Sequence, residues 1–205
     1  SNLDITVDKA NSTLIVNGQA VKYISEKDPT NLPWVANNVD IVLESTGLFT
    51  SYEKAAAHLK AGAKRVVLSA PAKEDGSPEF PGATVLMGAN EHVFTDKNIC
   101  ITSNASCTTN AASPLIHILH EAIGIEKALL NTTHAYTASQ SLVDGPNKKD
   151  WREGRAAAMN MSPASTGAAI ATTKVVTDLA GKFDGISIRV PIVAGSIVDI
   201  TFISK

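Results

Sequence analysis

The chain has 205 residues, of which 44% are hydrophobic, enough to bury the core of one large domain or two small ones. The net charge of −2 gives no reason to expect nucleic acid or an anionic membrane surface as a partner. No apolar run approaches a bilayer span, and the first residues lack the basic and apolar segments of a secretory signal. The two cysteines, Cys100 and Cys107, suggest a reducing compartment, so we expect a cytoplasmic enzyme without a membrane partner.

The first half predicts an α/β unit. Residues 3–23 read as short strands, with a hairpin turn at Asn17-Gly18, because this pair tolerates the positive φ angles of a tight turn. Residues 39–44 form a nearly continuous apolar strand, which is typical of a strand covered on both faces. A helix over 51–62 and a second buried strand over 65–68 complete a right-handed crossover.

Further strands are predicted at 83–87 and 98–102, so the first half indicates a partial, doubly wound sheet of the Rossmann type. A helix should begin near Ser106 and run to about Ile123, where Gly124 stops it, with Pro114 inside it.

The second half predicts an α+β domain. A strand over 125–134 is followed by an irregular stretch over 138–162 and a helix over 166–179. Two strands, 185–190 and 196–203, follow directly on each other, which indicates an antiparallel sheet with helices on one face. We therefore place the domain boundary near residue 105, between domains 1–105 and 106–205.

Cys107 is the strongest candidate for chemistry. Asn104 or Ser106 can cap the helix that begins here, which puts Cys107 in its first turn. The free N–H groups and the positive end of the helix dipole favour a nucleophilic thiolate. The same N–H groups, with the hydroxyls of Ser106 and Thr108, form a natural cradle for phosphate or an oxyanion.

Histidines differ in what their positions predict. His134 lies at the end of a strand that faces the domain junction, where an imidazole can partner a thiolate and move a proton. His58 and His92 read as surface or loop residues, and His117 and His120 lack a third metal ligand.

The chain resembles the phosphorylating glyceraldehyde-3-phosphate dehydrogenases along essentially its whole length. The motif that carries the resemblance best is Ser103-Asn104-Ala105-Ser106-Cys107-Thr108-Thr109-Asn110. The further motifs follow in the family's order: Asp28-Pro29, Leu32-Pro33-Trp34, Glu44-Ser45-Thr46-Gly47, Ser69-Ala70-Pro71, His134-Ala135-Tyr136-Thr137, Asp144-Gly145-Pro146, Gly154-Arg155-Ala156-Ala157, Ser165-Thr166-Gly167-Ala168-Ala169 and Arg189-Val190-Pro191.

The resemblance implies oxidation of glyceraldehyde 3-phosphate with NAD+ and inorganic phosphate, giving 1,3-bisphosphoglycerate and NADH. Cys107 matches the nucleophile that forms a thiohemiacetal and then a thioester, and His134 matches its base. Thr137 and Arg189 match the residues that hold the substrate's phosphate. The site for inorganic phosphate is matched by Ser106, Thr108, Thr166 and Gly167.

The same resemblance assigns residues 1–105 to a partial NAD-binding domain and 106–205 to a partial catalytic domain. Thr46, Gly47 and Phe49 match the loop beside the adenine of NAD, and Ser69 and Pro71 match the loop beside its nicotinamide. The Gly145-Pro146 pair favours NAD over NADP, and loop 138–162 matches the segment that packs in the core of a homotetramer.

Two departures from the family bear on activity. Ala111 stands where a second cysteine is usual, and the dinucleotide motif Gly-x-Gly-x-x-Gly does not occur in the sequence. We expect the family's N-terminal strand–loop–helix to precede residue 1 and its last strands and helix to follow Lys205, so this chain alone should have impaired activity.

Three alternative functions stand beside the main interpretation, and they differ from it in substrate or in the class of protein. Erythrose-4-phosphate dehydrogenase shares the thiohemiacetal chemistry and stays open. Aspartate-semialdehyde dehydrogenase fits less well with the Ser-Cys-Thr-Thr-Asn and His-Ala-Tyr-Thr motifs. A truncated chain with a non-catalytic binding or redox-sensing role also stays open.

Overall fold

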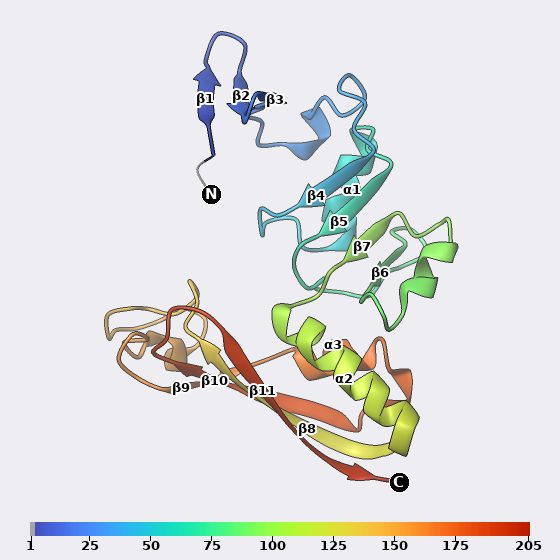
Figure 1. Ribbon diagram of the computed structural model, residues 1–205, viewed down its shortest axis with the longest axis vertical. Coiled ribbons are helices and arrows are strands. Elements are labelled where there is room, and N and C mark those ends of the chain that lie inside the picture. Colours follow the sequence, from blue (N-terminus) through green and yellow to red (C-terminus); the bar gives the residue numbers. More distant parts are fainter. Residues whose placement is uncertain (1–2) are drawn as a thin grey trace.

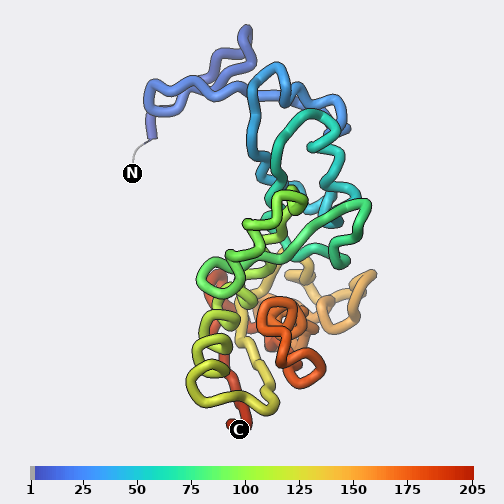
Figure 2. The backbone as a smooth tube through the Cα atoms, turned by 90° about the vertical axis from the view of Figure 1, so that its right-hand side faces the viewer, coloured from blue at the N-terminus to red at the C-terminus, as the bar shows by residue number. Residues whose placement is uncertain are grey.

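The computed structural model describes residues 3–205 and shows an elongated molecule with three β-sheets in a row (Figure 1). A small antiparallel sheet lies at one end, a parallel sheet lies in the middle, and a sheet of long strands lies at the other end. The view turned by 90° shows the same succession, with the first residues farthest from the C-terminal sheet (Figure 2). Among residues 3–205, no helix has both the length and the apolar character needed to cross a membrane.

The small sheet confirms the predicted hairpin. Its strands are β1 (Ile5–Asp8), β2 (Thr13–Val16) and β3 (Gln19–Lys22), paired antiparallel in chain order. Asn17 and Gly18 form the turn between β2 and β3 with φ angles of 48° and 79°. Both central residues therefore have positive φ, as a two-residue hairpin loop requires.

The middle sheet is parallel throughout and confirms an α/β unit of the Rossmann type. Its order is β4 (Ile41–Glu44), β5 (Arg65–Leu68), β7 (Ile101–Ser103) and β6 (Gly82–Thr84). Helix α1 (Tyr52–Lys60) joins β4 to β5, and the Ser51 hydroxyl caps it by accepting from the Lys54 N–H group at 3.2 Å. The core beneath α1 consists of Tyr52, Ala55, Ala56, Val66, Leu68 and Ile101.

One face of the parallel sheet differs from the prediction that its strands are covered on both sides. Along β4 the side chains alternate between exposed and buried, and Ile41 and Leu43 are 57% and 70% exposed. Val42 and Glu44 point to the other face and are buried. The alternation arises because α1 covers one face, and no described element covers Ile41 and Leu43 on the other.

The third sheet is mixed, which corrects the prediction of an antiparallel sheet. Its order is β11 (Ser196–Ser204), β8 (Ile125–Ala135), β10 (Phe183–Val190) and β9 (Ser162–Ser165). β11 and β9 pair antiparallel with their neighbours, but β10 runs parallel to β8. The chain between β8 and β10 includes a helix, and such a crossover returns the second strand in the same direction.

The predicted helix over 166–179 is shorter than expected. Helix α3 spans only Ala168–Thr173, and a 3-10 turn, η4 (Thr177–Leu179), follows it. Thr172 and Thr173 donate their hydroxyls to main-chain carbonyls one turn earlier, and Val175 and Val176 follow. This run of β-branched residues has low helix propensity, which accounts for the early end.

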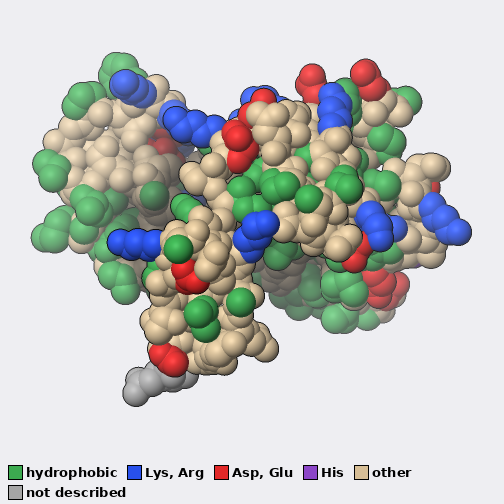
Figure 3. Space-filling model, turned by 90° about the horizontal axis from the view of Figure 1, so that it is seen from above, with side chains coloured by type: hydrophobic (Ala, Val, Ile, Leu, Met, Phe, Trp, Pro, Cys, Tyr) green, Lys and Arg blue, Asp and Glu red, His purple; other side chains and the backbone are tan. Residues whose placement is uncertain are grey.

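Helix α2 (Cys107–Ile123) packs against the third sheet and carries the candidate nucleophile at its first position. Gly124 ends it with a φ of 68°, as predicted. The predicted domain boundary falls between β7 and α2. The remaining 3-10 helices are η1 (Pro29–Asn31), η2 (Glu91–Thr95) and η3 (Trp151–Gly154). Seen from above, Lys and Arg side chains are interspersed with Asp and Glu (Figure 3).

Candidate active site

A sharp turn places Cys107 at the junction of the two larger sheets. Ala105 joins β7 to α2 with a φ of 55°, a left-handed conformation that is uncommon for a residue with a Cβ. Ser106 then caps α2 by accepting from the Thr109 N–H group at 3.1 Å. Cys107 is therefore the first helical residue, is exposed, and lies beside the positive end of the helix dipole.

His134 faces the Cys107 thiol. The Cys107 Sγ and His134 Nε2 atoms are 3.5 Å apart, although 27 residues separate them in the sequence. The other ring nitrogen, Nδ1, is 2.8 Å from the Ala135 carbonyl oxygen. Because a carbonyl only accepts hydrogen bonds, Nδ1 carries the proton and Nε2 directs its lone pair at the sulfur. The arrangement suits His134 to accept the thiol proton.

A pocket of about 280 Å³ opens around this pair. All the residues predicted to be catalytic or to bind phosphate line it, together with one residue of the predicted nicotinamide loop. They are Cys107, His134, Ser106, Thr108, Thr137, Thr166, Gly167, Arg189 and Pro71. The pocket thus combines one thiol, one imidazole, one guanidinium and several hydroxyls, a set of donors suited to phosphate groups.

Arg189 is tied to the same carbonyl as His134. Arg189 lies opposite His134 in the parallel pairing of β10 with β8, and its Nη1 atom donates to the Ala135 oxygen at 3.3 Å. The Arg189 Nε–H group is buried and has no hydrogen-bond partner among the described residues. The guanidinium therefore has donor capacity left for an anion. Thr137 lies two residues beyond Ala135, with its hydroxyl 3.1 Å from that of Ser139.

Two pocket residues, Thr132 and Ser187, were not predicted from the sequence. They lie directly opposite each other on β8 and β10, each two residues before His134 or Arg189. Both are 1% exposed, and neither hydroxyl has a partner among residues 3–205. Because strand side chains alternate with a period of two, their spacing from His134 and Arg189 was the signal that could have found them.

The predicted cofactor residues lie in two loops at the carboxyl ends of β4 and β5, outside the Cys107 pocket except for Pro71. Phe49 and its neighbour Leu48 line a separate cavity of about 580 Å³. Gly47 has a φ of 75°, which an L side chain rarely adopts. Ser69 donates its main-chain N–H and its hydroxyl to the Glu44 carbonyl, at 3.0 and 3.2 Å.

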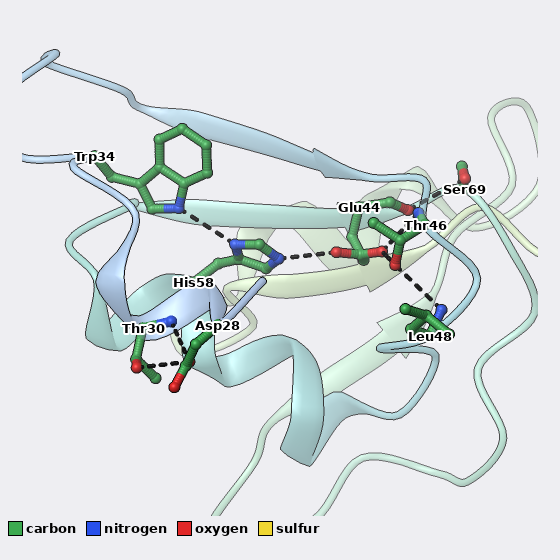
Figure 4. Close-up of polar contacts among 8 residues, drawn as sticks. All are labelled: Asp28, Thr30, Trp34, Glu44, Thr46, Leu48, His58 and Ser69. Carbon is green, nitrogen blue, oxygen red and sulfur yellow. Dashed lines mark hydrogen bonds and ion pairs between the residues drawn. The ribbon is translucent and has the colours of Figure 1, made fainter. Parts of the chain in front are cut away.

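His58 is not a surface residue, so the prediction for it was wrong. It is 4% exposed and lies between Glu44 and Trp34 (Figure 4). Its Nε2 atom is 2.9 Å from Glu44 Oε2, and its Nδ1 atom accepts from Trp34 Nε1 at 3.2 Å. Burial raises the pKa of the Glu44 carboxyl, but hydrogen bonds from Thr46 and His58 together outweigh burial and hold this pKa below its ordinary value of 4.5.

The fold and the pocket define a class of protein: an α/β protein that holds a cysteine–histidine pair where a parallel sheet of the nucleotide-binding type meets a second domain. Comparison with known families makes this specific. The model of the glyceraldehyde 3-phosphate dehydrogenase NAD binding domain matches residues 1–52, and the model of the C-terminal domain matches residues 106–205. The chain belongs to the glyceraldehyde-3-phosphate dehydrogenase family.

Similar proteins occur in fungi and plants. The chain is 48% identical over 200 residues to glyceraldehyde-3-phosphate dehydrogenase B of Aspergillus oryzae, which covers 98% of this chain and 57% of that protein. It is 47% identical over 196 residues to the enzyme of Podospora anserina, covering 96% and 56%. A chloroplastic relative from Arabidopsis thaliana is 48% identical over 190 residues, covering 93% and 43%. The chain thus spans little more than half the length of these fungal relatives.

Proposed function

We propose that this chain carries the catalytic centre for NAD-dependent, phosphorylating oxidation of glyceraldehyde 3-phosphate to 1,3-bisphosphoglycerate, a step of glycolysis and gluconeogenesis. The observation that carries the proposal is the 3.5 Å contact between Cys107 Sγ and His134 Nε2 in a pocket that Arg189 also lines. Thiol, base and anion-binding group are what an aldehyde phosphate requires. The family membership supports the same reaction.

We assign a first role to each member of the pair. His134 Nε2 takes the proton of the Cys107 thiol, and the sulfur attacks the aldehyde carbon. The resulting oxyanion takes this proton back from His134, which gives the thiohemiacetal and leaves the imidazole neutral again. Protonated His134 keeps its Nδ1–H bond to the Ala135 carbonyl, so the ring holds its orientation. The free N–H groups at the start of α2 would donate to the developing oxyanion.

Bound NAD+ would supply the acceptor for the hydride of the thiohemiacetal carbon. His134 takes the proton of the thiohemiacetal hydroxyl, which leaves a thioester on Cys107. An oxygen of inorganic phosphate then attacks the thioester carbonyl, the carbon–sulfur bond breaks, and 1,3-bisphosphoglycerate leaves with the Cys107 thiolate restored.

Two groups of side chains suit the two phosphates of this reaction. Arg189 and Thr137 lie at the carboxyl ends of β10 and β8 and are assigned to the substrate's own phosphate. The hydroxyls and N–H groups around the starts of α2 and α3 are assigned to the attacking phosphate, through Ser106, Thr108, Thr166 and Gly167. A charge-assisted contact from Arg189 anchors the substrate while the weaker donors allow phosphate to enter and leave.

The loops fit the proposed NAD. Thr46, Gly47 and Phe49 lie at the carboxyl end of a parallel strand, where nucleotides bind in such sheets, and Phe49 lines a cavity of about 580 Å³. Pro71 belongs both to the loop after β5 and to the wall of the Cys107 pocket. A nicotinamide ring held by this loop would lie against the reacting centre.

We further propose a cytoplasmic homotetramer assembled through loop 138–162. Large apolar side chains in this loop are exposed to an extent that is unusual for a monomer surface. They are Leu142 (60%), Val143 (80%), Trp151 (89%), Met159 (81%) and Met161 (74%). Sedimentation or light scattering of the protein with Val143→Asp should show dissociation relative to the unchanged sequence.

The test of the proposed reaction is phosphate-dependent formation of NADH from glyceraldehyde 3-phosphate, with erythrose 4-phosphate as the competing substrate. We expect glyceraldehyde 3-phosphate to be turned over faster and Cys107 to be acylated in the absence of phosphate. Faster turnover of erythrose 4-phosphate would reassign the substrate. Absence of NADH, of the acyl enzyme and of NAD binding would support a non-catalytic role instead.

A further inference from the structure

A buried polar chain runs from Trp34 through His58 and Glu44 to the loop after β4 (Figure 4). It lies on the covered side of the parallel sheet, outside the residues that line the Cys107 pocket. The side chain of His58 is only 5% exposed, and that of Glu44 is only 3% exposed. Burial of a charged carboxylate is costly, so a carboxylate at this position requires full compensation by hydrogen bonds.

Every hydrogen bond in the chain has a fixed direction. An indole N–H only donates, so His58 Nδ1 accepts from Trp34 and the ring carries its proton on Nε2. His58 Nε2–H therefore donates to Glu44 Oε2 at 2.9 Å. On the other side, Glu44 Oε1 accepts from the Thr46 N–H group at 2.8 Å and from the Thr46 hydroxyl.

Hydrogen bonds connect Glu44 to residues beyond Thr46. The Thr46 hydroxyl, which donates to Glu44, accepts from the Leu48 N–H group at 3.1 Å. The main-chain carbonyl of Glu44 accepts from both the N–H and the hydroxyl of Ser69. One residue thus fixes the two loops that the proposed function assigns to the cofactor. The first loop is exposed and contains Gly47, so its own residues supply little rigidity.

We propose that Glu44 and His58 are positioning residues that hold the loops at 45–49 and 69–71 in the conformation that binds the dinucleotide. This inference rests on the proposed function, since the ligand of the loops is the NAD of that reaction. Neither side chain touches the ligand: Glu44 acts through Thr46 and Ser69, and His58 acts by fixing the Glu44 carboxylate.

Substitution at Glu44 tests whether this position needs a group that accepts hydrogen bonds both from Thr46 and from His58. In Glu44→Gln the amide presents its NH2 group either to Thr46 or to His58 Nε2–H, which places donor against donor. Thr46→Val removes the hydroxyl from an exposed loop and leaves the core intact, whereas Thr46→Ser retains the hydroxyl. Asp40→Asn is the matched control, because this carboxylate pairs with Lys64 on the surface beside the opposite end of β4.

The measurements are amide hydrogen exchange at Thr46 and Leu48, the Kd for NAD+, and the alkylation rate of Cys107 by iodoacetamide. We expect Glu44→Gln and Thr46→Val to lose amide protection and to bind NAD+ about tenfold more weakly, the effect of losing a hydrogen bond to a charged group. Thr46→Ser should keep more amide protection and bind NAD+ more tightly than Thr46→Val. Asp40→Asn should match the unchanged chain, and the alkylation rate should be constant throughout.

The outcomes separate the positioning role from the proposed function. Unchanged amide exchange in both Glu44→Gln and Thr46→Val would overturn the positioning role, and so would NAD+ affinity that stays constant while protection is lost. A chain of unchanged sequence that binds no NAD+ would overturn the proposed function, and the cofactor role of the loops with it. If Glu44→Gln does not fold, Thr46→Val against Thr46→Ser decides alone.

Discussion

Two histidines of this chain have opposite surroundings. His58 is buried and has both ring nitrogens engaged, one by Trp34 and the other by Glu44. His134 is half-buried and has one nitrogen fixed by a carbonyl, while the other faces a thiol at 3.5 Å. A histidine that reacts keeps one ring nitrogen free of structural hydrogen bonds, whereas a histidine that positions other groups uses both nitrogens in such bonds.

The largest effect should come from removing the group that His134 faces. Cys107→Ser should lower the oxidation of glyceraldehyde 3-phosphate by on the order of 10³-fold or more, because the hydroxyl is a far weaker nucleophile. The measurement is NADH formation together with iodoacetamide labelling of the protein. Cys100→Ser is the control, since Cys100 lies outside the pocket and its thiol contacts the Lys97 carbonyl. Equal loss in both variants would contradict the assignment.

Removing the available nitrogen itself should cost less. His134→Ala should slow aldehyde oxidation by about 10²-fold, the usual contribution of a positioned general base. The pH profile of the Cys107 alkylation rate should change both in its shape and in its maximal rate. His117→Ala serves as the comparison, because His117 lies on the same helix as Cys107 but contacts Glu121. A profile that is identical in His134→Ala and the unchanged chain would reject the pair.

Arg189 tests the anion-binding side of the same pocket. Arg189→Ala should raise the KM for glyceraldehyde 3-phosphate about thirtyfold. This factor corresponds to the loss of a charge-assisted contact worth ~2 kcal/mol of binding free energy. The value of kcat should change less than KM. Arg65→Ala, at the beginning of β5, provides a matched loss of a guanidinium outside the pocket. A constant KM in Arg189→Ala would remove this residue from the substrate site.

The smallest effect concerns the buried carboxylate. The pKa of Glu44 is lower in the folded chain than its ordinary value of 4.5. Its contribution to the free energy of unfolding is therefore complete above pH 4.5 and is lost as the pH falls through the lower, folded value. Urea unfolding at a series of acidic pH values should show a steeper loss of stability in the unchanged chain than in Glu44→Gln. Equal slopes would contradict this linkage.

The sequence was most informative where local rules decide the structure. The Asn17-Gly18 turn and the Gly124 helix end depend on a few neighbouring residues, and both predictions were confirmed. The helix cap was expected at Asn104 or Ser106, and the structure has Ser106. The Cys107–His134 contact joins two sheets, and local patterns alone could only suggest it. The resemblance to a family added Thr137, Thr166, Gly167, Arg189 and Pro71 to the residues expected there, but it did not point to Thr132 and Ser187.

Predictions failed where a partner distant in sequence decides the outcome. His58 reads as a surface or loop residue, because the sequence does not show that Trp34 and Glu44 converge on it. The alternation of exposure along β4 depends on which elements cover the sheet, and the parallel pairing of β8 with β10 depends on a crossover of some fifty residues. These features depend on tertiary contacts, which the hydrophobic pattern of a sequence does not reveal.

The fixed polarity of the Trp34–His58–Glu44 chain also bears on proton transport. A proton wire works only if each hydrogen bond can reverse, so that a group that donates in one state accepts in the next. The indole nitrogen of Trp34 has no lone pair with which to accept, and the chain therefore ends in a group that cannot reverse. His58 and Glu44 therefore cannot conduct a proton toward Trp34, and their hydrogen-bond network has a structural role.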